Sequence, residues 1–189
     1  MSRLSRVLFL LLCVLAVQAE PPGRSPSAGG AESFPHSFQL AFPTTSSYPL
    51  LFPVAQEDFL SFSSTFGWRI SPTLKILAYH NGVDIEAVPK AQVVAAADGW
   101  VDELWPPPDG WYRGHPLYGG LIILRHSNGL RTLYAHLSAV LVVGWQAVRA
   151  GQVIGRIGTT GKAVGEHLHF EVQMDWMTLN PLLYLKLPR

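Results

Sequence analysis

Short apolar segments separated by glycine-containing turns recur from residue 53 onward, and they constrain the fold more than any other feature. Residues 120–125 (GLIILR) and residues 130–135 (LRTLYA) flank Asn128-Gly129, a dipeptide typical of tight β-hairpins. Residues 167–172 (HLHFEV) alternate between polar and apolar side chains with the period of two that a strand requires. These segments therefore predict paired strands.

Two further segments fit the same pattern. Residues 92–97 (QVVAAA) run into the turn dipeptide Asp98-Gly99, and residues 147–155 predict another short strand pair with glycine turns. No long stretch of this part has helical periodicity, and only brief helical turns are expected near residues 56–60 and 179–184. The predicted fold class is therefore all-β, a sandwich or a barrel.

The beginning of the chain has a different composition. An apolar run at residues 7–17 (VLFLLLCVLAV) follows Arg3 and Arg6, and Val17-Gln18-Ala19 at its end has small residues at the positions that a signal peptidase reads. This arrangement predicts a signal peptide over residues 1–19. The alternative is an uncleaved membrane anchor, but the run is shorter than the roughly 20 residues of a spanning helix. We therefore expect export to the periplasm or beyond, with no stable membrane insertion after cleavage.

The organisation expected after the signal peptide is a linker and one domain. Residues 21–35 (PPGRSPSAGGAESFP) are rich in Pro, Gly, Ser and Ala, a composition that buries little surface. Residues 38–52 add aromatic side chains and fit an arm along a domain. The predicted organisation is a linker or arm over residues 20–52 and a folded domain over residues 53–189.

Charge and cysteine content restrict the function. The formal net charge is +1, with Lys and Arg scattered along the chain, so we expect no nucleic-acid partner. The single cysteine, Cys13, lies inside the predicted signal peptide. After cleavage the chain would have no disulfide, and any metal would have to be bound by nitrogen and oxygen ligands.

Two short motifs carry residue types that bind metals. His167 and His169 are two residues apart on a predicted strand, so their rings should share one face. His80 and Asp84 flank a turn in which Gly82 would let the backbone bring the two side chains together. Read alone, the first pair fits ordinary surface histidines and the second motif fits a polar loop.

Together, the two motifs offer three nitrogen and oxygen ligands. Such a set suits a catalytic zinc site with a fourth position left open, whereas structural zinc sites are closed by four ligands, often cysteines. His136 ends the predicted return strand of the hairpin, and a histidine beside an open zinc site can donate a hydrogen bond or transfer a proton. Its alternative is a strand-end histidine bonded to the backbone.

At this point the chain resembles the lysostaphin/LytM-type zinc metallopeptidases, which are peptidoglycan endopeptidases. The resemblance covers about residues 53–187. It is carried by motifs that occur in the order FGWR (66–69), His80-x-x-x-Asp84, ADGWV (97–101), YAHLS (134–138), GQVIG (151–155), HLHFEV (167–172) and Asn180-Pro181.

The resemblance implies a fold, a site and an activity. The fold would be a small antiparallel β sandwich with a groove across the metal, similar to a duplicated hybrid motif. His80, Asp84 and His169 would bind Zn²⁺, and His136 and His167 would be the catalytic residues. The activity would be hydrolysis of a peptide bond in a stem-peptide crosslink or an interpeptide bridge of peptidoglycan, with any regulatory protein unknown.

Other functions stay open at this stage. The main rival is a non-catalytic module of the same fold that activates another cell-wall hydrolase. The complete five-residue set argues against it, because activators of this kind have lost some of these residues. An extracellular signalling protein that keeps zinc without catalysis, and a metal-dependent hydrolase acting on something other than peptide, are further alternatives.

Three segments outside these motifs carry weaker expectations. The loop at residues 105–116 contains Trp111, Tyr112 and His115, and it fits either a groove wall or a rigid surface loop. His126 lies at the predicted hairpin tip, where we expect it to be solvated. The glycine-rich segment 155–162 fits either a connecting loop or a wall of the groove, and the resemblance favours the wall.

Overall fold

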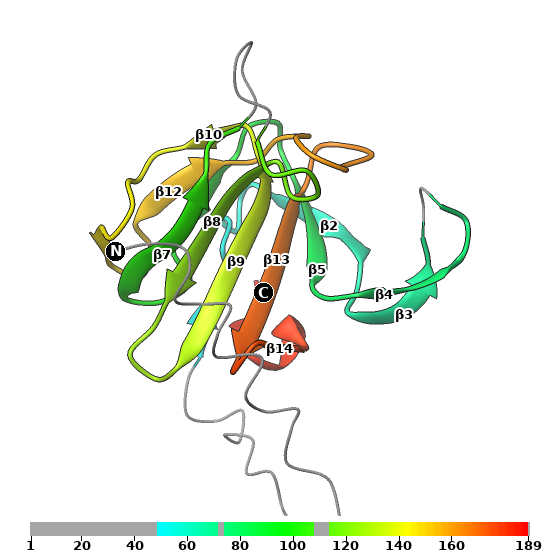
Figure 1. Cartoon of the computed structure of the whole chain (residues 1–189). Coiled ribbons are helices and arrows are strands. Elements are labelled where there is room, and N and C mark those ends of the chain that lie inside the picture. The colour runs from blue at the N-terminus through cyan, green and yellow to red at the C-terminus, as the bar shows by residue number, and fades with distance from the viewer. Residues whose placement is uncertain (1–48, 72–73, 108–113, 189) are drawn as a thin grey trace, which may run out of the picture. The chain divides into compact units, whose positions relative to one another are not determined.

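The computed structural model describes residues 49–71, 74–107 and 114–188, which belong to one compact unit spanning residues 41–189 (Figure 1). The expectations for residues 1–48, for Trp111 and for Tyr112 lie outside the described residues. No helix in the described part of the chain is long and apolar enough to cross a membrane. The all-β prediction is confirmed, because the elements of the described residues are strands apart from one short 3-10 helix, η2 (Pro181–Leu183).

The largest element is an antiparallel sheet of eight strands. Across this sheet the order is β11 (Ala147–Val148), β7 (Gly99–Trp105), β8 (Gly120–Arg125), β9 (Leu130–Leu137), β13 (Leu168–Met174), β5 (Val83–Ala87) and β2 (Phe59–Ser64), with β14 (Met177–Leu179) also paired to β13.

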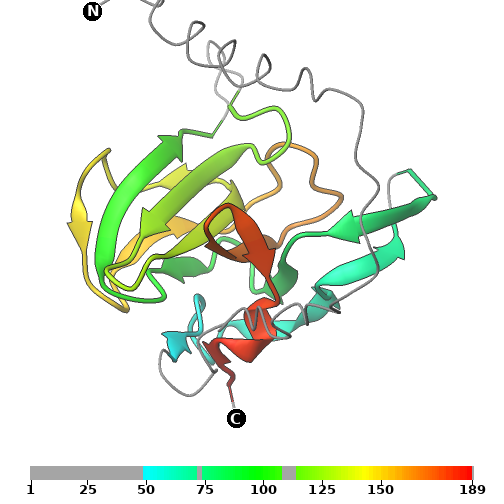
Figure 2. The ribbon, with the colours of Figure 1, turned by 60° about the horizontal axis from the view of Figure 1, so that its bottom comes forward.

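Three smaller sheets complete the fold. A three-stranded sheet has the order β10 (Ala139–Val140), β12 (Val153–Arg156) and β6 (Gln92–Val94). A parallel pair joins β1 (Leu50–Leu51) to β15 (Leu185–Lys186). An antiparallel hairpin joins β3 (Gly67–Ile70) to β4 (Leu77–His80), and in Figures 1 and 2 it extends away from the large sheet.

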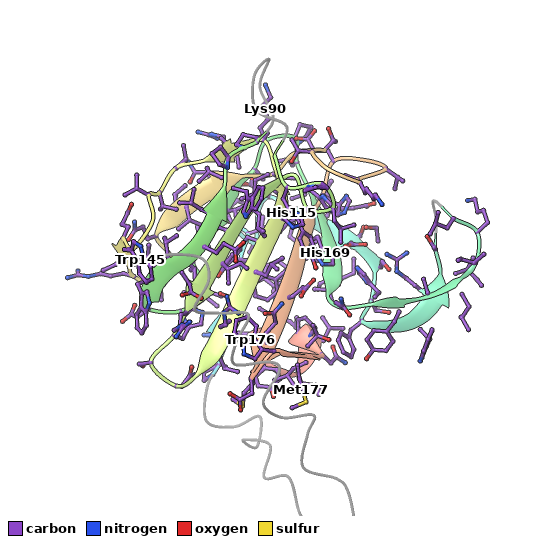
Figure 3. All side chains as sticks on the ribbon, in the orientation of Figure 1. Lys90, His115, Trp145, His169, Trp176 and Met177 are labelled. Atoms are coloured by element: carbon purple, nitrogen blue, oxygen red, sulfur yellow. The ribbon has the colours of Figure 1, made fainter. Side chains whose placement is uncertain are left out.

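The main core lies between the large sheet and the three-stranded sheet. Apolar side chains of β13, including Leu168 and Phe170, pack in one cluster with Val93 of β6 and Ile154 of β12, and all four are fully buried. Strand alternation puts the polar side chains of β13 on the opposite face of the large sheet. This second face is where the candidate site lies, and Figure 3 labels His169 among its side chains.

Several local predictions are confirmed. The Asn128-Gly129 hairpin joins β8 to β9, and Gly129 has the positive φ of 84° that favours glycine in such a turn. The helical turn expected near residues 179–184 appears as η2 (Pro181–Leu183), in which the side chain of Asn180 caps the amide of Leu182.

One pairing prediction is wrong. Residues 147–155 do contain two strands, but β11 pairs with β7 of the large sheet, whereas β12 pairs with β10 and β6. The glycine turn at Gly151, with φ 79°, therefore passes the chain from one sheet to the other instead of closing a hairpin. The ordered fold also includes β1, because Leu50 is 1% exposed and packs in the main core, three residues before the boundary expected at residue 53.

Candidate metal centre and active site

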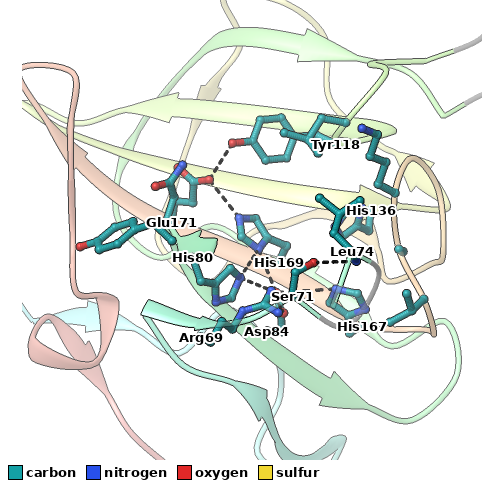
Figure 4. A pocket seen from close by; sticks show the side chains of 16 residues that line it. Arg69, Ser71, Leu74, His80, Asp84, Tyr118, His136, His167, His169 and Glu171 are labelled. Carbon is teal, nitrogen blue, oxygen red and sulfur yellow. Dashed lines mark hydrogen bonds and ion pairs between the residues drawn. The ribbon is translucent and has the colours of Figure 1, made fainter. Parts of the chain in front are cut away.

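The structure brings His80, Asp84 and His169 together in one buried cluster (Figure 4). Asp84 Oδ1 lies 2.8 Å from His169 Nδ1 and 3.1 Å from His80 Nε2, and the two ring nitrogens are 3.1 Å apart. The three atoms lie within 4.8 Å of one another. The cluster therefore presents two nitrogens and one oxygen to a common point.

Strand register explains this convergence. Asp84 of β5 and His169 of β13 are directly paired across two neighbouring strands, and His80 ends β4 four residues before Asp84. Gly82, between them, is required for a different reason than the sequence predicted. Its φ is not among the positive values, but a Cβ there would lie 2.3 Å from the carbonyl oxygen of Phe170. Only a residue without a side chain allows the backbone to approach β13 so closely.

Hydrogen bonds on the far side of each ring fix which nitrogen faces the cluster. His80 Nδ1 lies 2.9 Å from the carbonyl oxygen of Thr65, and His169 Nε2 lies 2.9 Å from Oε1 of Glu171. Both oxygens can only accept, so these nitrogens carry the ring protons. In the neutral rings, the lone pairs on His80 Nε2 and His169 Nδ1 then point into the cluster, where they can bind a cation.

Glu171 is a site residue that the motif reading did not assign. It is 1% exposed, and its carboxylate also accepts hydrogen bonds from the Tyr118 hydroxyl at 2.8 Å and from Gln173 Nε2 at 2.7 Å. The Tyr118 ring stacks on the His169 ring, with centroids 5.7 Å apart. Glu171 could have been found from the sequence, since it is two residues after His169 on the same strand face. Nothing in the local sequence marks Tyr118.

His136 and His167 lie beside the cluster with a similar arrangement. His136 Nδ1 is 2.7 Å from the carbonyl oxygen of Thr160, and His167 Nδ1 is 2.9 Å from that of Gly165. Each Nε2 is thereby left as an acceptor. The two rings have centroids 4.9 Å apart, and His167 Nε2 lies 3.7 Å from Oδ1 of Asp84.

The backbone at these two histidines departs from the simple strand prediction. His167 lies just before β13 and forms an isolated bridge with Gly158 instead of belonging to the strand. His136 has a φ of 63°, in the left-handed region that side chains other than glycine rarely adopt. Its orientation therefore does not follow the alternation of β9. Strained backbone of this kind clusters at functional sites.

The electrostatics of the cluster favour a bound cation. Burial alone would lower the pKa of His169, but hydrogen bonds and charge from Asp84 and Glu171 raise it to about 9. Burial alone would raise the pKa of Asp84, but hydrogen bonds from His169 and His80 hold it well below its usual range. The two buried carboxylates thus stabilise positive charge on His169, and a cation bound at the same point would be stabilised in the same way.

The donor set fits zinc. Zn²⁺ takes imidazole nitrogens and carboxylate oxygens, and catalytic zinc sites have three protein ligands and one open position. The cluster supplies three inward donor atoms, and the far sides of its two histidine rings are held by Thr65 and Glu171. Histidine ligands supported in this way by a carbonyl or a carboxylate are the rule in zinc proteins.

The cluster lies in a pocket of about 600 Å³. Side chains of the β3–β4 hairpin and its loop line the pocket together with the five predicted site residues, Tyr118 and residues 162–164. Within the segment 155–162, only Lys162 lines the pocket, while Arg156 belongs to β12.

The prediction that His126 is solvated is wrong. The residue, at the hairpin tip, is 3% exposed. Its Nδ1 lies 2.8 Å from the carbonyl oxygen of Asp98, and its Nε2 lies 2.8 Å from the Thr132 hydroxyl. His115 forms a bridge with Gly119, and its Nδ1 accepts hydrogen bonds from the amides of Leu117 and Tyr118. Both histidines are therefore structural within the described residues.

A β fold with a buried His-Asp-His cluster, an open pocket and two flanking histidines is typical of metal-dependent hydrolases. Comparison with known families agrees: residues 78–181, more than half of the chain, match the model of Peptidase family M23. The chain belongs to this family. The resemblance to lysostaphin/LytM-type peptidases is thereby confirmed.

Similar proteins include enzymes and an activator. The chain is 39% identical over 121 residues to the DD-carboxypeptidase/endopeptidase Mpg of Neisseria meningitidis serogroup B, covering 64% of this chain and 26% of that protein. It is 37% identical over 108 residues to the murein hydrolase activator NlpD of Escherichia coli, covering 56% of this chain and 26% of NlpD. The chain thus spans about a quarter of the length of these relatives.

Solved structures with the same fold include a zinc-containing peptidase from Vibrio cholerae, with a TM-score of 0.56 and 29% identity over 68% of this chain and 39% of that one. The catalytic domain of lysostaphin from Staphylococcus simulans gives a TM-score of 0.53 and 28% identity, covering 65% of this chain and 89% of that domain.

Proposed function

We propose that this protein is an exported zinc metalloendopeptidase that hydrolyses peptide bonds in peptidoglycan crosslinks or bridges. His80, Asp84 and His169 would bind the zinc ion, and His136 and His167 would act on the substrate. The observation that carries the proposal is that all five side chains are buried and line one pocket, with ligand atoms of His80, Asp84 and His169 within 4.8 Å of one another. The named peptidases among the relatives support the same activity.

The roles of the two flanking histidines follow from their tautomers. Since Thr160 and Gly165 accept from Nδ1, each Nε2 can take a proton and then donate it. Burial, together with the charges of His167 and His169, lowers the pKa of His136 to about 4, so its ring is neutral near pH 7 and can act as a base. The bound zinc ion would supply a Lewis acid that activates water and polarises the scissile carbonyl.

Either histidine can then assist two later events. A protonated Nε2 can donate a hydrogen bond to the developing oxyanion, or pass the proton to the leaving amine. The two rings are 4.9 Å apart and face the same pocket. One histidine can thus serve the attacking side while the other serves the leaving side.

The alternative function is that of a module which activates another cell-wall hydrolase. It is favoured by the similarity to NlpD, a murein hydrolase activator. An activator needs no intact centre, whereas here the three inward donor atoms, the two flanking histidines and their supporting hydrogen bonds are all present. The site thus favours the enzyme.

Location is part of the proposal. A substrate in the cell wall requires that the folded domain leave the cytoplasm, and residues 1–19 have the pattern of a signal peptide that would direct this. Residues 20–52 would connect that signal to the domain, and Leu50, near the end of the connection, is buried in the core.

The experiment is a digestion of purified peptidoglycan by the zinc-loaded protein and by His80→Ala, His136→Ala and His167→Ala variants. We expect new amino termini with the parent protein and a loss of them in each variant. New reducing sugar ends would instead indicate glycan cleavage. If the parent protein releases nothing but stimulates a second hydrolase equally well with or without His136, the activator function holds and the enzyme function is rejected.

A further inference from the structure

We propose that Arg69 forms a subsite for a substrate carboxylate beside the metal centre. The proposal rests on the proposed peptidase function and narrows its substrate class. It predicts a peptide bond whose amine-side residue carries a free carboxylate on the carbon attached to the scissile nitrogen. A direct stem-peptide crosslink or a C-terminal residue can meet this requirement, whereas an internal bond of an interpeptide bridge without such a carboxylate cannot.

Arg69 has more hydrogen-bonding capacity than its surroundings use. It lies on β3, paired with Ala78 of β4, and its side chain lines the pocket. Its Nη2 is 3.6 Å from Oδ2 of Asp84, which is beyond hydrogen-bond distance. Its Nε is buried and has no hydrogen-bond partner among the residues that the structure describes.

A guanidinium has five N–H donors in a rigid fork, and the fork matches the two oxygens of a carboxylate. Arg131 of β9 likewise has a buried Nε without a hydrogen-bond partner among the described residues, but its Nη2 donates to Asp102 at 2.8 Å and its guanidinium stacks on Trp176. Arg69, by contrast, faces a pocket that is open to a ligand (Figure 4).

The charges of the pocket point to an anionic ligand. Two carboxylates line it, from Asp84 and Glu171, and two cationic side chains, Arg69 and Lys162, balance them. The remaining lining residues are neutral apart from the histidines. A bound Zn²⁺ would add two positive charges without any further carboxylate to offset them. A substrate carboxylate restores part of the balance.

The position of Arg69 sets where that carboxylate lies on the substrate. One oxygen of Asp84 faces the two ring nitrogens of the cluster, and the other faces Arg69. The guanidinium is therefore separated from the donor atoms of the centre by the width of one carboxylate group. A carboxylate bound there belongs to the residue next to the scissile bond and not to a distant part of the substrate.

The alternative role for Arg69 is that its side chain only holds Asp84 in place. That role would affect every substrate alike and would also change zinc binding. A carboxylate subsite would instead change the preference between substrates that differ only in the carboxylate. The two readings thus predict different results for one Arg69→Ala variant.

The test compares two peptides, diacetyl-Lys-D-Ala-D-Ala and its C-terminal carboxamide, with the zinc-loaded protein. We expect the parent to prefer the acid in kcat/KM by about 10–100-fold, the range for charge-assisted hydrogen bonds. In Arg69→Ala this preference falls toward one, and Arg69→Lys restores part of it. Arg149→Ala is the matched control, since Arg149 is exposed and outside the pocket, and it should keep the full preference.

A binding measurement keeps the proposal testable if neither small peptide is cleaved. D-Alanine and D-alaninamide are titrated into the zinc-loaded parent and Arg69→Ala proteins, with binding followed by NMR, and zinc content is measured for each. We expect D-alanine to bind at least tenfold more tightly than the amide only when Arg69 is present. Equal binding of the two in the parent, or the same preference in Arg69→Ala, overturns the subsite whether or not the protein is a peptidase.

Discussion

The hydrogen bond between Glu171 and His169 offers a direct test of how the metal centre is supported. In Glu171→Gln, the amide oxygen can still accept from His169 Nε2 and from the Tyr118 hydroxyl, but the negative charge is gone. The amide nitrogen would face Gln173 Nε2, now 2.7 Å from the carboxylate, and a flip of the Gln173 amide would satisfy it. The variant thus removes charge with little change of shape.

The size of the effect follows from this geometry. Supporting groups of this kind change metal affinity by about 10–100-fold, which is about 1.4–2.7 kcal/mol. Because the hydrogen bond itself survives, we expect Glu171→Gln to raise the zinc dissociation constant by about tenfold. Glu171→Ala removes both charge and acceptor, and we expect it to approach 100-fold.

The assay is a competitive titration of zinc against a chromophoric chelator at fixed pH. Glu103→Gln is the matched control, because Glu103 also accepts a hydrogen bond, from the Trp105 indole at 2.8 Å, but does not line the pocket. A Glu171→Gln protein that binds zinc within twofold of the parent would refute the idea that Glu171 tunes His169. Thermal unfolding of each metal-free variant shows whether a weaker affinity comes from a loss of folding.

Three further predictions concern other parts of the molecule. His136→Ala and His167→Ala should keep one zinc ion per chain by elemental analysis while losing about 10²–10⁴-fold in kcat on peptidoglycan; loss of zinc from either variant would contradict the assigned roles. Burial lowers the pKa of His126, so its folded value lies below the unfolded value of about 6.5. Its contribution to stability is therefore present above that pH and lost as pH falls, and thermal unfolding between pH 5 and 8 should show a steeper acid loss than in His126→Gln. Gly82→Ala would place a Cβ 2.3 Å from the Phe170 carbonyl oxygen, and we expect a loss of about 1–3 kcal/mol in the free energy of unfolding together with weaker zinc binding; a fully stable variant would show that the strands can separate without cost.

The convergence of His80, Asp84 and His169 could be predicted from the sequence because the residues lie in short motifs, which together resemble a known family. Strand periodicity places His169 and Glu171 on one face of β13, and a four-residue spacing links His80 to Asp84. The hairpin at Asn128-Gly129 follows from turn chemistry alone. These features could be predicted because each depends on residues that are close together in the chain.

The features that escaped prediction depend on contacts between distant segments. Tyr118 and Glu171 are 53 positions apart in the sequence, and no residue next to Tyr118 indicates their hydrogen bond. The separation of β11 from β12 depends on which sheet accepts each strand, which short apolar segments do not specify. His126 contacts Asp98, 28 positions away, as well as Thr132 in the return strand of its own hairpin, and the turn chemistry specifies neither contact.

The sequence motif identified Gly82 as a required glycine, but the physical reason expected for it was wrong. The turn reading expected glycine for its backbone freedom, but its φ needs no such freedom. The limit is instead the close approach to β13, which only the register of β5 against β13 reveals. Local sequence rules can thus find a site while the packing that requires it stays hidden.

The most direct test of the central claim is metal removal and restoration during peptidoglycan digestion. We expect the purified protein to carry one zinc ion per chain, to stop releasing amino termini when a chelator removes it, and to recover when one equivalent of zinc is returned. His80→Ala should fail to recover under the same conditions. Full release of amino termini by the metal-free protein, or none by the zinc-loaded protein, would contradict the assignment of a zinc peptidase centre at His80, Asp84 and His169.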